Sequence, residues 1–365
     1  MNDTEFIKEM LRKIKSDARS VSGAFDNFIS KEITITAGTR EVASKSQKSL
    51  REFIKNENDR DKTFPVLLSE VDSDYIGGSY GRETKIWPLD DIDIYLPLEG
   101  KGLVYFDQSG VLPYIVLSDN TNYSNPINTP RWYRNGVISS EVIINEYAAV
   151  LRRHYPEPTE VYPNGQAISI RMTHGETKDT DGLGYDIVPC FSLESSEYGN
   201  GEKFYLIPDG SNGWIRTNPR LDADICDYLN KYHNGVYKKV VRLVKFWNKT
   251  KLNGVLSSYY IEHAMCGIFS EKAKERIVLS KVSQGVAWGM YELNRVLRIG
   301  NQKSMINGAP EITSGLKGIS ALILAEVECE EVANCAKSAW NLESALNEVA
   351  AIKEWKKVFG DSFGE

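Results

Sequence analysis

Alternating apolar and polar positions predict strands in the first half of the chain. The segment DDIDIYLPL, residues 90–98, carries Ile92, Ile94 and Leu96 at every second position, which is the period of a strand with one face in a core. Its polar positions are carboxylates, and carboxylates are costly to place in a strand that enters a core. Four further strands are predicted over residues 65–79, 166–173, 184–193 and 203–209.

A helical period dominates the second half. The segment GVYKKVVRLVKFWNK, residues 235–249, places a stripe of apolar side chains on one helix face. This stripe consists of Val236, Val240, Leu243, Val244 and Trp247. Helices are also predicted over residues 3–30, 40–57, 139–153, 257–269 and 314–359. The two helices before residue 60 carry few apolar residues, so we expect them to lie across a surface rather than through a core.

The change from strands to helices falls at residues 209–220, a segment rich in glycine, asparagine and proline. Such a composition is typical of a connection between domains. We therefore predict two domains: residues 1–215, an α/β (α+β) core with a mixed sheet, and residues 216–365, a helical domain. A two-lobed molecule with a cleft between the domains is the expected shape, because ligand sites favour domain interfaces.

Composition narrows the classes of partner. The 365-residue chain has a formal net charge of −6, whereas a dedicated nucleic-acid binder carries a basic balance or stripe. Its five cysteines are scattered without metal-ligand spacing, as in proteins of a reducing cytosol. The amino-terminal stretch lacks the apolar run of a signal peptide, and no segment approaches the ~18 apolar residues of a membrane span. We expect a cytoplasmic protein that binds neither DNA nor membrane.

The carboxylates of the first strand form the chemical centre of the sequence. Asp91 and Asp93 are two positions apart and therefore share one face. Two carboxylates on one face repel each other unless a cation lies between them, and Mg²⁺ takes such oxygen ligands. Asp186, in GYDIVPCF, is flanked by apolar residues in the same way. Three converging acids can hold two cations about 3.5–4 Å apart, so we predict two Mg²⁺ ions, or Mn²⁺ in their place. A solvent-facing alternating strand is the alternative.

A double glycine and a serine precede these acids. Gly78 lets the backbone approach a phosphate closely, and exposed N–H groups around Ser79 would form a nest for an anion. A glycine pair also marks turns in general, and a serine also caps helices. The turn is therefore a candidate phosphate site because of its place directly before the acids.

The complete stretch GGSYGRETKIWPLDDIDIYL resembles the signature of the DNA-polymerase-β-like nucleotidyltransferase superfamily, in which Gly-Ser precedes Asp-x-Asp and a third acid follows on a later strand. Within that superfamily the chain most resembles the bacterial CD-NTases, relatives of cyclic GMP-AMP synthase and oligoadenylate synthase. The segments IPDGSNGWIRTNPR, LVKFWNK, LSSYYIE and AIKEWKKVFGDSFGE resemble further elements of that family. The resemblance spans residues 75–360. The chain lacks the zinc-binding insertion of the animal DNA sensor and a basic amino-terminal helix face, which argues against activation by DNA.

The resemblance implies a role for each matched residue of the first half. Gly78 and Ser79 would hold the β- and γ-phosphates of the donor nucleotide. Asp91 and Asp93 would bind both metal ions. Asp186 would bind the catalytic ion and deprotonate the acceptor hydroxyl.

The resemblance also implies nucleotide-binding residues in the second half of the chain. Lys245 and Ser258 would reach the triphosphate, Tyr259 would stack on the donor base, and Thr217 would touch the second nucleotide. Plainer interpretations exist for three of them. Lys245 lies on a helix rich in lysine and arginine, which ordinarily presents a solvated face. Ser258 and Tyr259 also fit a helix cap and a buried aromatic side chain.

The function that the resemblance implies is the synthesis of a cyclic oligonucleotide second messenger from ATP or GTP, with loss of pyrophosphate. In bacteria such enzymes resemble the sensors of anti-phage (CBASS) signalling, whose product activates a separate effector, and a regulatory protein is a further expected partner. Three alternatives remain. A template-independent RNA nucleotidyltransferase of the poly(A) or CCA type would need a basic RNA-binding surface. The others are a protein-adenylylating toxin and a catalytically idle nucleotide-binding module.

Overall fold

The computed structural model describes residues 20–68, 75–106, 114–117, 124–155, 157–172, 183–194, 203–299 and 319–365. The contacts among these residues form two compact units. The first, which we call the sheet unit, comprises Ile35–Gly81 and Pro88–Leu221. The second, the helical unit, comprises residues 20–34, Arg82–Trp87 and the described residues from Asp222 onward. This division differs from a single boundary at residue 215, because two segments of the first half belong to the helical unit.

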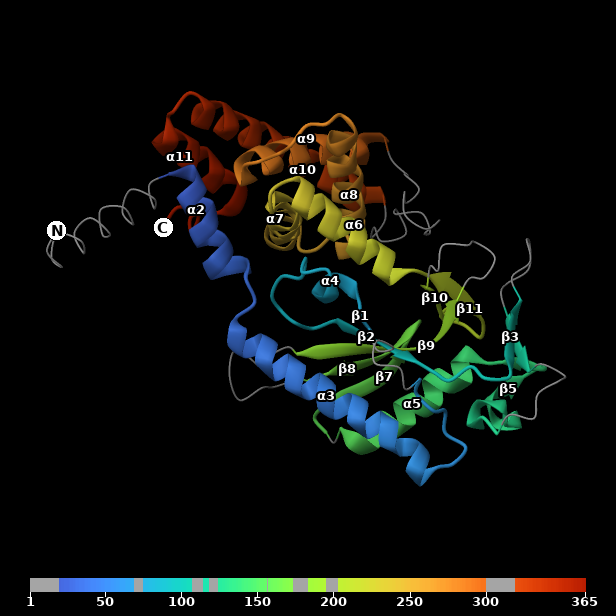
Figure 1. Cartoon of the computed structure of the whole chain (residues 1–365). Helices are drawn as coiled ribbons and strands as arrows, with labels where there is room; N and C mark the ends of the chain where they lie inside the picture. The colour runs from blue at the N-terminus through green and yellow to red at the C-terminus, as the bar shows by residue number, and fades with distance from the viewer. Residues whose placement is uncertain are drawn as a thin grey trace, which may run out of the picture. The chain divides into compact units, whose positions relative to one another are not determined.

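Among the described residues, a seven-stranded sheet forms the centre of the sheet unit (Figure 1). Its main path runs β1 (Tyr75–Ile76), β2 (Ile92–Pro97), β9 (Gly184–Glu194), β10 (Lys203–Pro208) and β11 (Trp214–Thr217). In addition, β8 (Ala167–Arg171) pairs with β9, and β7 (Glu160–Asn164) pairs with β8. The β2 and β9 strands are parallel, whereas β1 and β8 run antiparallel to them. The predicted mixed sheet is therefore confirmed.

Shorter elements surround this sheet: α4 (Gly78–Gly81), β3 (Leu103–Phe106), β4 (Tyr114–Leu117), β5 (Tyr133–Arg134), β6 (Val137–Ile138) and the 3₁₀ turns Pro126–Asn128 and Pro130–Trp132. The strand predicted over residues 65–79 is much shorter in the structure. It is reduced to β1 and to a single bridge between Leu67 and Leu98. Residues 69–74 of that prediction lie outside the described residues.

One face of the sheet packs against two helices, α3 (Ala37–Arg60) and α5 (Ser140–His154), which Figure 1 shows running along the sheet. Alternate side chains of the strands, such as Ile94 and Ile187, are completely buried in this core. Leu50 of α3 and Ile143 of α5 belong to the same core and are also completely buried. Because strand side chains alternate between faces, the polar positions between these residues point to the opposite face of the sheet.

The helical unit contains η1 (Ile29–Ile33), α2 (Val21–Phe28), α6 (Pro219–Tyr232), α7 (Val236–Lys251), α8 (Ser258–Lys274), α9 (Val282–Ile299), α10 (Ile319–Ser344) and α11 (Glu348–Phe359). The boundary between the units falls inside α6, after Leu221. The predicted apolar stripe of α7 is confirmed, since Val240, Leu243 and Trp247 are all completely buried. No helix in the described part of the chain is long and apolar enough to cross a membrane.

The amino-terminal helix corrects one expectation. We predicted that it lies across a surface, but Phe25 and Phe28 of α2 are only 1% and 2% exposed. The Phe25 ring meets the rings of Trp355 and Phe363 edge-on, at centroid distances of 5.0 and 4.9 Å. The few apolar residues of α2 therefore lie on one face and enter the core of the helical unit. Residues 3–19 of the predicted helix lie outside the described residues.

Candidate active site

The carboxylates of the predicted metal site lie on the sheet face opposite to the α3–α5 core. Ile92 and Ile94 of β2 are completely buried in that core. Asp91, directly before β2, and Asp93, within it, are half-buried. The alternation of a strand therefore brings both carboxylates to the other face, as the sequence predicts.

Strand register brings the third acid alongside. Asp93 of β2 is the register partner of Asp186 on the parallel strand β9. Asp186 is in turn the register partner of Ser169 on the antiparallel strand β8. Neighbouring strands lie about 4.8 Å apart, so these three residues form a row across the sheet. We call Asp91 together with this row, Asp93, Asp186 and Ser169, the acid row.

The glycine-serine turn lies directly against the acid row. Gly78 begins α4 with a backbone φ of +61°, a region that favours glycine. A Cβ atom at Gly78 would come within 1.6 Å of Asp93 Oδ2, so only glycine fits there. The backbone N–H of Gly77 also donates to the Asp93 carbonyl oxygen over 3.0 Å. Ser79 is 8% exposed at this turn. The predicted phosphate turn and the predicted metal ligand are thus in contact.

Two residues that our sequence analysis did not identify hold Asp186. The Ser169 hydroxyl donates to Asp186 Oδ1 over 2.6 Å, and Arg171 Nη2 donates to the same oxygen over 3.0 Å. Both lie on β8, two positions apart and therefore on one face. The alternation of ISIR, in which buried Ile168 and Ile170 each precede one of these two polar residues, is the signal that would have placed both on one face of the strand.

The acid row has the chemistry of a magnesium site but is not an assembled one. Within the described ranges, no three histidine, cysteine, aspartate or glutamate side chains are placed to hold one ion. Carboxylate oxygens on one sheet face are the ligands that Mg²⁺ prefers. Asp186 instead points Oδ1 at Ser169 and Arg171. The residues therefore fit the metal by type and by shared face, and the binding of two Mg²⁺ ions stays a prediction.

Thr217 lies apart from this row within the sheet. It ends β11 and is the register partner of Tyr205 on β10. The strand order β2-β9-β10-β11 separates it from Asp93 by two intervening strands. Its predicted contact with a second nucleotide remains a prediction.

Lys245 occupies a buried charge cluster of the helical unit, which we define as Lys245, Glu262, Arg82 and Thr84. The Lys245 ammonium bonds Glu262 Oε1, and its side chain is only 3% exposed. Thr84 donates to the same oxygen over 2.8 Å. Arg82 Nε donates to Glu262 Oε2 over 2.7 Å. The solvated-face interpretation of Lys245 is therefore wrong, and its observed partner is a carboxylate of its own unit.

Burial and pairing act in opposite directions on the pKa values of this cluster. Burial alone would raise the pKa of the Glu262 carboxyl, but Arg82 and Lys245 hold this pKa well below its usual range, at about 2. Burial lowers the pKa of Lys245, against the attraction of Glu262. The cluster thus carries its charges in the interior because each is compensated nearby.

The neighbouring lysine of α7 is also not solvated. Lys238 is 9% exposed. Its ammonium donates to Asp227 over 2.5 Å and to Glu83 over 2.9 Å. The lysine-rich run of α7 is therefore an anchoring surface for the segment Arg82–Trp87, which connects the glycine-serine turn to β2 along the chain.

Ser258 and Tyr259 begin α8. The residue that caps this helix is Ser257, whose hydroxyl accepts from the Tyr260 N–H over 3.0 Å. Ser258 is exposed. Tyr259 is 43% exposed and lies beside the His263 ring at a centroid distance of 3.9 Å. The cap and buried-aromatic interpretations of these two residues are thus wrong, and both side chains are accessible to a ligand.

Known proteins resemble the chain in sequence and fold. No protein-family model matches it. A probable cyclic nucleotide synthase from Bacillus cereus (strain VD146) is 27% identical over 354 residues, which cover 94% of this chain and 98% of that protein. Two structures of CdnC from E. coli MS115-1, one with ATP and one in complex with HORMA-deltaN, match at 15% identity with TM-scores of 0.58 and 0.59. Each match covers 94% of this chain and 98% of the solved one. The resemblance to bacterial CD-NTases is therefore confirmed.

Proposed function

We propose that this chain, which resembles the bacterial CD-NTases in sequence and fold, joins nucleoside triphosphates into a cyclic oligonucleotide and releases pyrophosphate. The observation that carries the proposal is the contact between Gly78 and the Asp93 carboxylate, with Asp186 in register beside it. The turn that we propose for phosphate binding would thus lie against the Asp93 carboxylate, with Asp186 on the neighbouring strand. The similarity to a cyclic nucleotide synthase over nearly the whole chain supports the same reaction.

The metal ions of this reaction would be two Mg²⁺ ions, or Mn²⁺ in their place, held by Asp91, Asp93 and Asp186. Bound there, the metal would neutralise developing charge on the transferred phosphate and on the leaving pyrophosphate. Arg171 and Ser169 would orient Asp186 before metal binds, because both donate to its Oδ1.

The protein's own groups would position the reactants. The N–H groups of the turn at Gly78 and Ser79 would hold the β- and γ-phosphates of the donor. Asp186 would accept the proton of the attacking acceptor hydroxyl. Tyr259 would stack on the donor base, Ser258 would bind the triphosphate at the start of α8, and Thr217 would contact the second nucleotide.

Lys245 receives a different role. Its ammonium bonds Glu262 inside the helical unit, so direct phosphate contact would require it to leave a buried carboxylate uncompensated, which is costly. We propose that Lys245 instead anchors the Arg82–Trp87 segment within the helical unit, through their shared partner Glu262.

The proposed substrates are ATP and GTP. The proposed biological setting is a bacterial anti-phage (CBASS) system in which the cyclic product activates a separate effector and a regulatory protein controls the enzyme. CdnC has been solved with ATP and in complex with a HORMA protein, which supports this kind of nucleotide and partner. The net charge of −6 disfavours a role for DNA, and it equally disfavours the poly(A)- or CCA-type alternative.

The test is product identification. The purified chain is incubated with labelled ATP, GTP, CTP and UTP, singly and mixed, with Mg²⁺, and the products are treated with phosphatase. Phosphatase-resistant products with two or three phosphodiester linkages are expected. Linear tails added to RNA, or adenylylated protein, would instead support the alternatives. Double-stranded DNA should leave turnover unchanged.

A further inference from the structure

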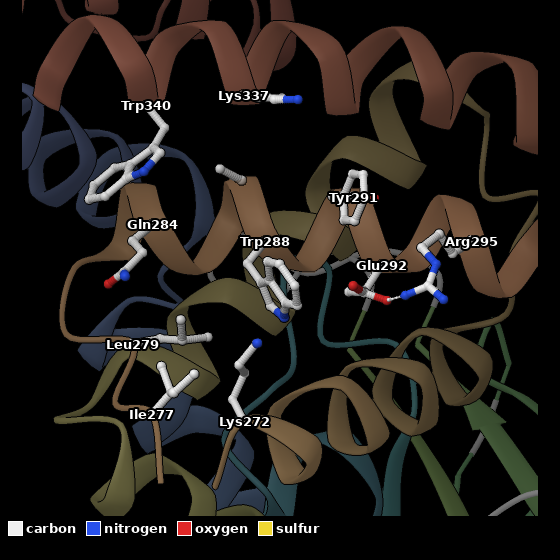
Figure 2. Close-up of a pocket in the computed structure, with 11 residues that line it drawn as sticks. Lys272, Ile277, Leu279, Gln284, Trp288, Tyr291, Glu292, Arg295, Lys337 and Trp340 are labelled. Atoms are coloured by element: carbon white, nitrogen blue, oxygen red, sulfur yellow. Dashed lines mark hydrogen bonds and ion pairs between the residues drawn. The ribbon is translucent and has the colours of Figure 1, made fainter. Parts of the chain in front are cut away.

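A cavity of about 600 Å³ opens in the helical unit between α8, α9, α10 and the loop that follows α8 (Figure 2). Its walls carry the aromatic side chains Trp288, Tyr291 and Trp340 and the cationic side chains Lys272, Arg295 and Lys337. None of the residues that we propose for substrate binding lines it. Its volume lies within the range of roughly 300–1,000 Å³ that is typical of small-molecule sites.

The cavity is positively charged on an acidic protein. Its lining holds three cations and one carboxylate, Glu292, whereas the whole chain has a formal net charge of −6; two of the three cations are paired. Glu292 bonds Arg295 over 2.7 Å, and Lys272 bonds Glu275 over 2.6 Å. Lys337 is exposed and has no ion-pair partner in the described part of the chain. Figure 2 shows it on the side of α10 that faces α9. Lys337 is therefore the cation of the cavity that is available to bind an anion.

One aromatic ring of the cavity is exposed, and the other two, of Trp288 and Trp340, are half-buried. Tyr291 is 46% exposed, in contrast to Trp247 and Trp355 of the same unit, which are completely buried. The rings of Trp288 and Tyr291 lie 5.8 Å apart and are tilted by 38°, so they form neighbouring planar surfaces along α9. Lys272 lies 3.9 Å from the centre of the Trp288 ring. Exposed aromatic surface beside a cation is suited to a flat ligand that carries a negative charge.

We propose that this cavity binds a nucleoside phosphate, with the base on Tyr291 and Trp288 and the phosphate at Lys337. Base stacking on aromatic side chains is favourable for every base. A lysine ammonium is a compact phosphate-binding charge. The site would be separate from the substrate site, because its lining includes neither the acid row nor Ser258 and Tyr259. The proposal of this second site does not depend on the proposed synthase activity.

The probe is AMP, added to the full chain carrying Asp91→Asn and Asp93→Asn in buffer with EDTA. These changes remove metal-dependent binding at the acid row. Binding is measured by saturation-transfer NMR on the adenine protons and by calorimetry. We expect saturable binding that weakens by about tenfold with Lys337→Glu, since a charge-assisted contact is lost. Tyr291→Ala should weaken it by about fivefold or more through lost stacking.

Two comparisons make the test decisive. Lys353→Glu is a matched charge reversal on α11, where Lys353 is also exposed, and it should leave AMP affinity within about twofold. Adenosine and ribose 5-phosphate should each bind at least about tenfold more weakly than AMP, because each lacks one half of the recognised chemistry. Absence of saturable AMP binding would overturn the proposal. So would equal affinities for the Lys337→Glu and Lys353→Glu chains, or equal affinities for ribose 5-phosphate and AMP.

Discussion

The acid row of the sheet unit and the buried charge cluster of the helical unit both contain carboxylates, but these carboxylates have different surroundings. Glu262 is 6% exposed at its side chain and has Arg82, Lys245 and Thr84 around it. Its charge is compensated inside the fold. The acid row places three carboxylates, Asp91, Asp93 and Asp186, on one half-buried face, where Arg171 bonds Asp186. The buried charge cluster balances its charges within the fold, whereas the acid row carries more carboxylates than Arg171 alone can balance.

The two regions are linked through the chain. The segment Arg82–Trp87 lies between the turn at Gly78 and strand β2, yet it belongs to the helical unit. Arg82 and Thr84 fix it to Glu262, and Ile86 packs against the helical core. The buried charge cluster therefore holds the segment that connects the turn at Gly78 to strand β2. Loss of the cluster should affect stability first, whereas loss of the acid row should affect only chemistry.

The largest expected effect comes from the acid row. Asp91→Asn with Asp93→Asn should reduce synthesis by on the order of a thousandfold or more, because the two proposed metal ions would lose ligands. The melting temperature in metal-free buffer should stay unchanged, because asparagine keeps the shape of both side chains. Product yield and thermal unfolding are measured together.

Asp59→Asn is the matched control for this double variant. Asp59 is an exposed acid of α3 that pairs with Lys62, so its removal should change neither quantity. Retained synthesis by the double variant would remove the acid row from the mechanism.

Substitution in the buried charge cluster should reduce stability, in contrast to substitution in the acid row. Glu262→Gln keeps the side-chain shape but leaves Arg82 and Lys245 without their shared carboxylate, so the free energy of unfolding should fall by about 3–5 kcal/mol. Glu271→Gln on the same helix removes an exposed partner of Lys274 and should cost less than about 1 kcal/mol. Urea unfolding measures both. Similar losses in the two variants would mean that burial of Glu262 does not matter.

Acid should weaken this cluster within a defined pH window. The pKa of Glu262 is about 2 in the fold and about 4.3 in an unfolded chain. Between these values the unfolded state binds more protons, so the stabilisation is complete above about pH 5 and is lost as pH falls towards 2. The loss is roughly 3 kcal/mol.

The pH measurement compares variants rather than absolute curves. Asp61, whose pKa is also held at about 2 by hydrogen bonds from Arg131 and Thr63, contributes in the same window. The difference in the free energy of unfolding between the wild type and Glu262→Gln should therefore depend on pH. The corresponding difference for Glu271→Gln should not. A difference that stays constant from pH 6 to pH 3 would contradict the depressed pKa of Glu262.

Substitution of Lys245 distinguishes a contact with the triphosphate, which the sequence suggests, from a structural role, which the structure suggests. Lys245→Met retains the apolar stem and removes the bond to Glu262, which should cost about 2 kcal/mol of stability. Affinity for a non-hydrolysable ATP analogue should change less than about twofold in our interpretation. A direct phosphate contact would instead cost roughly 1.5–3 kcal/mol of affinity. Lys251→Ala, on an exposed position of α7, is the control for both measurements.

Local sequence patterns predict helices, strands and buried faces better than they predict which side chains pair with one another. The period-2 run of β2 places Asp91 and Asp93 on one face correctly, and the stripe of α7 places Trp247 in the core. The same patterns do not reveal that Lys245 meets Glu262, since these residues lie on different helices and their pairing depends on packing. The sequence spacing also gives no sign that Arg82–Trp87 leaves the sheet unit, because a segment's unit is decided by tertiary contacts.

The smallest expected effect concerns the residues that orient Asp186. Ser169→Ala removes one hydrogen bond to Asp186 Oδ1, over 2.6 Å in the fold, and should lower kcat about tenfold, the equivalent of one bond to a charged group. A positioning role predicts a higher Mg²⁺ concentration for half-maximal activity while the KM for ATP stays unchanged. Ser169→Thr, which restores the hydroxyl, should recover most of the loss.

Ser211→Ala provides the matched control, because this exposed serine donates to Asp209 over 2.9 Å in the same unit but lies outside the acid row. It should alter neither kcat nor the Mg²⁺ dependence. Arg171→Lys keeps the positive charge beside Asp186 but loses the planar donor geometry of the guanidinium, so its effect should match that of Ser169→Ala in kind. If Ser169→Ala lowers the melting temperature and leaves the Mg²⁺ dependence untouched, Ser169 supports the sheet and not the site. The acid row would then owe its geometry to strand register alone.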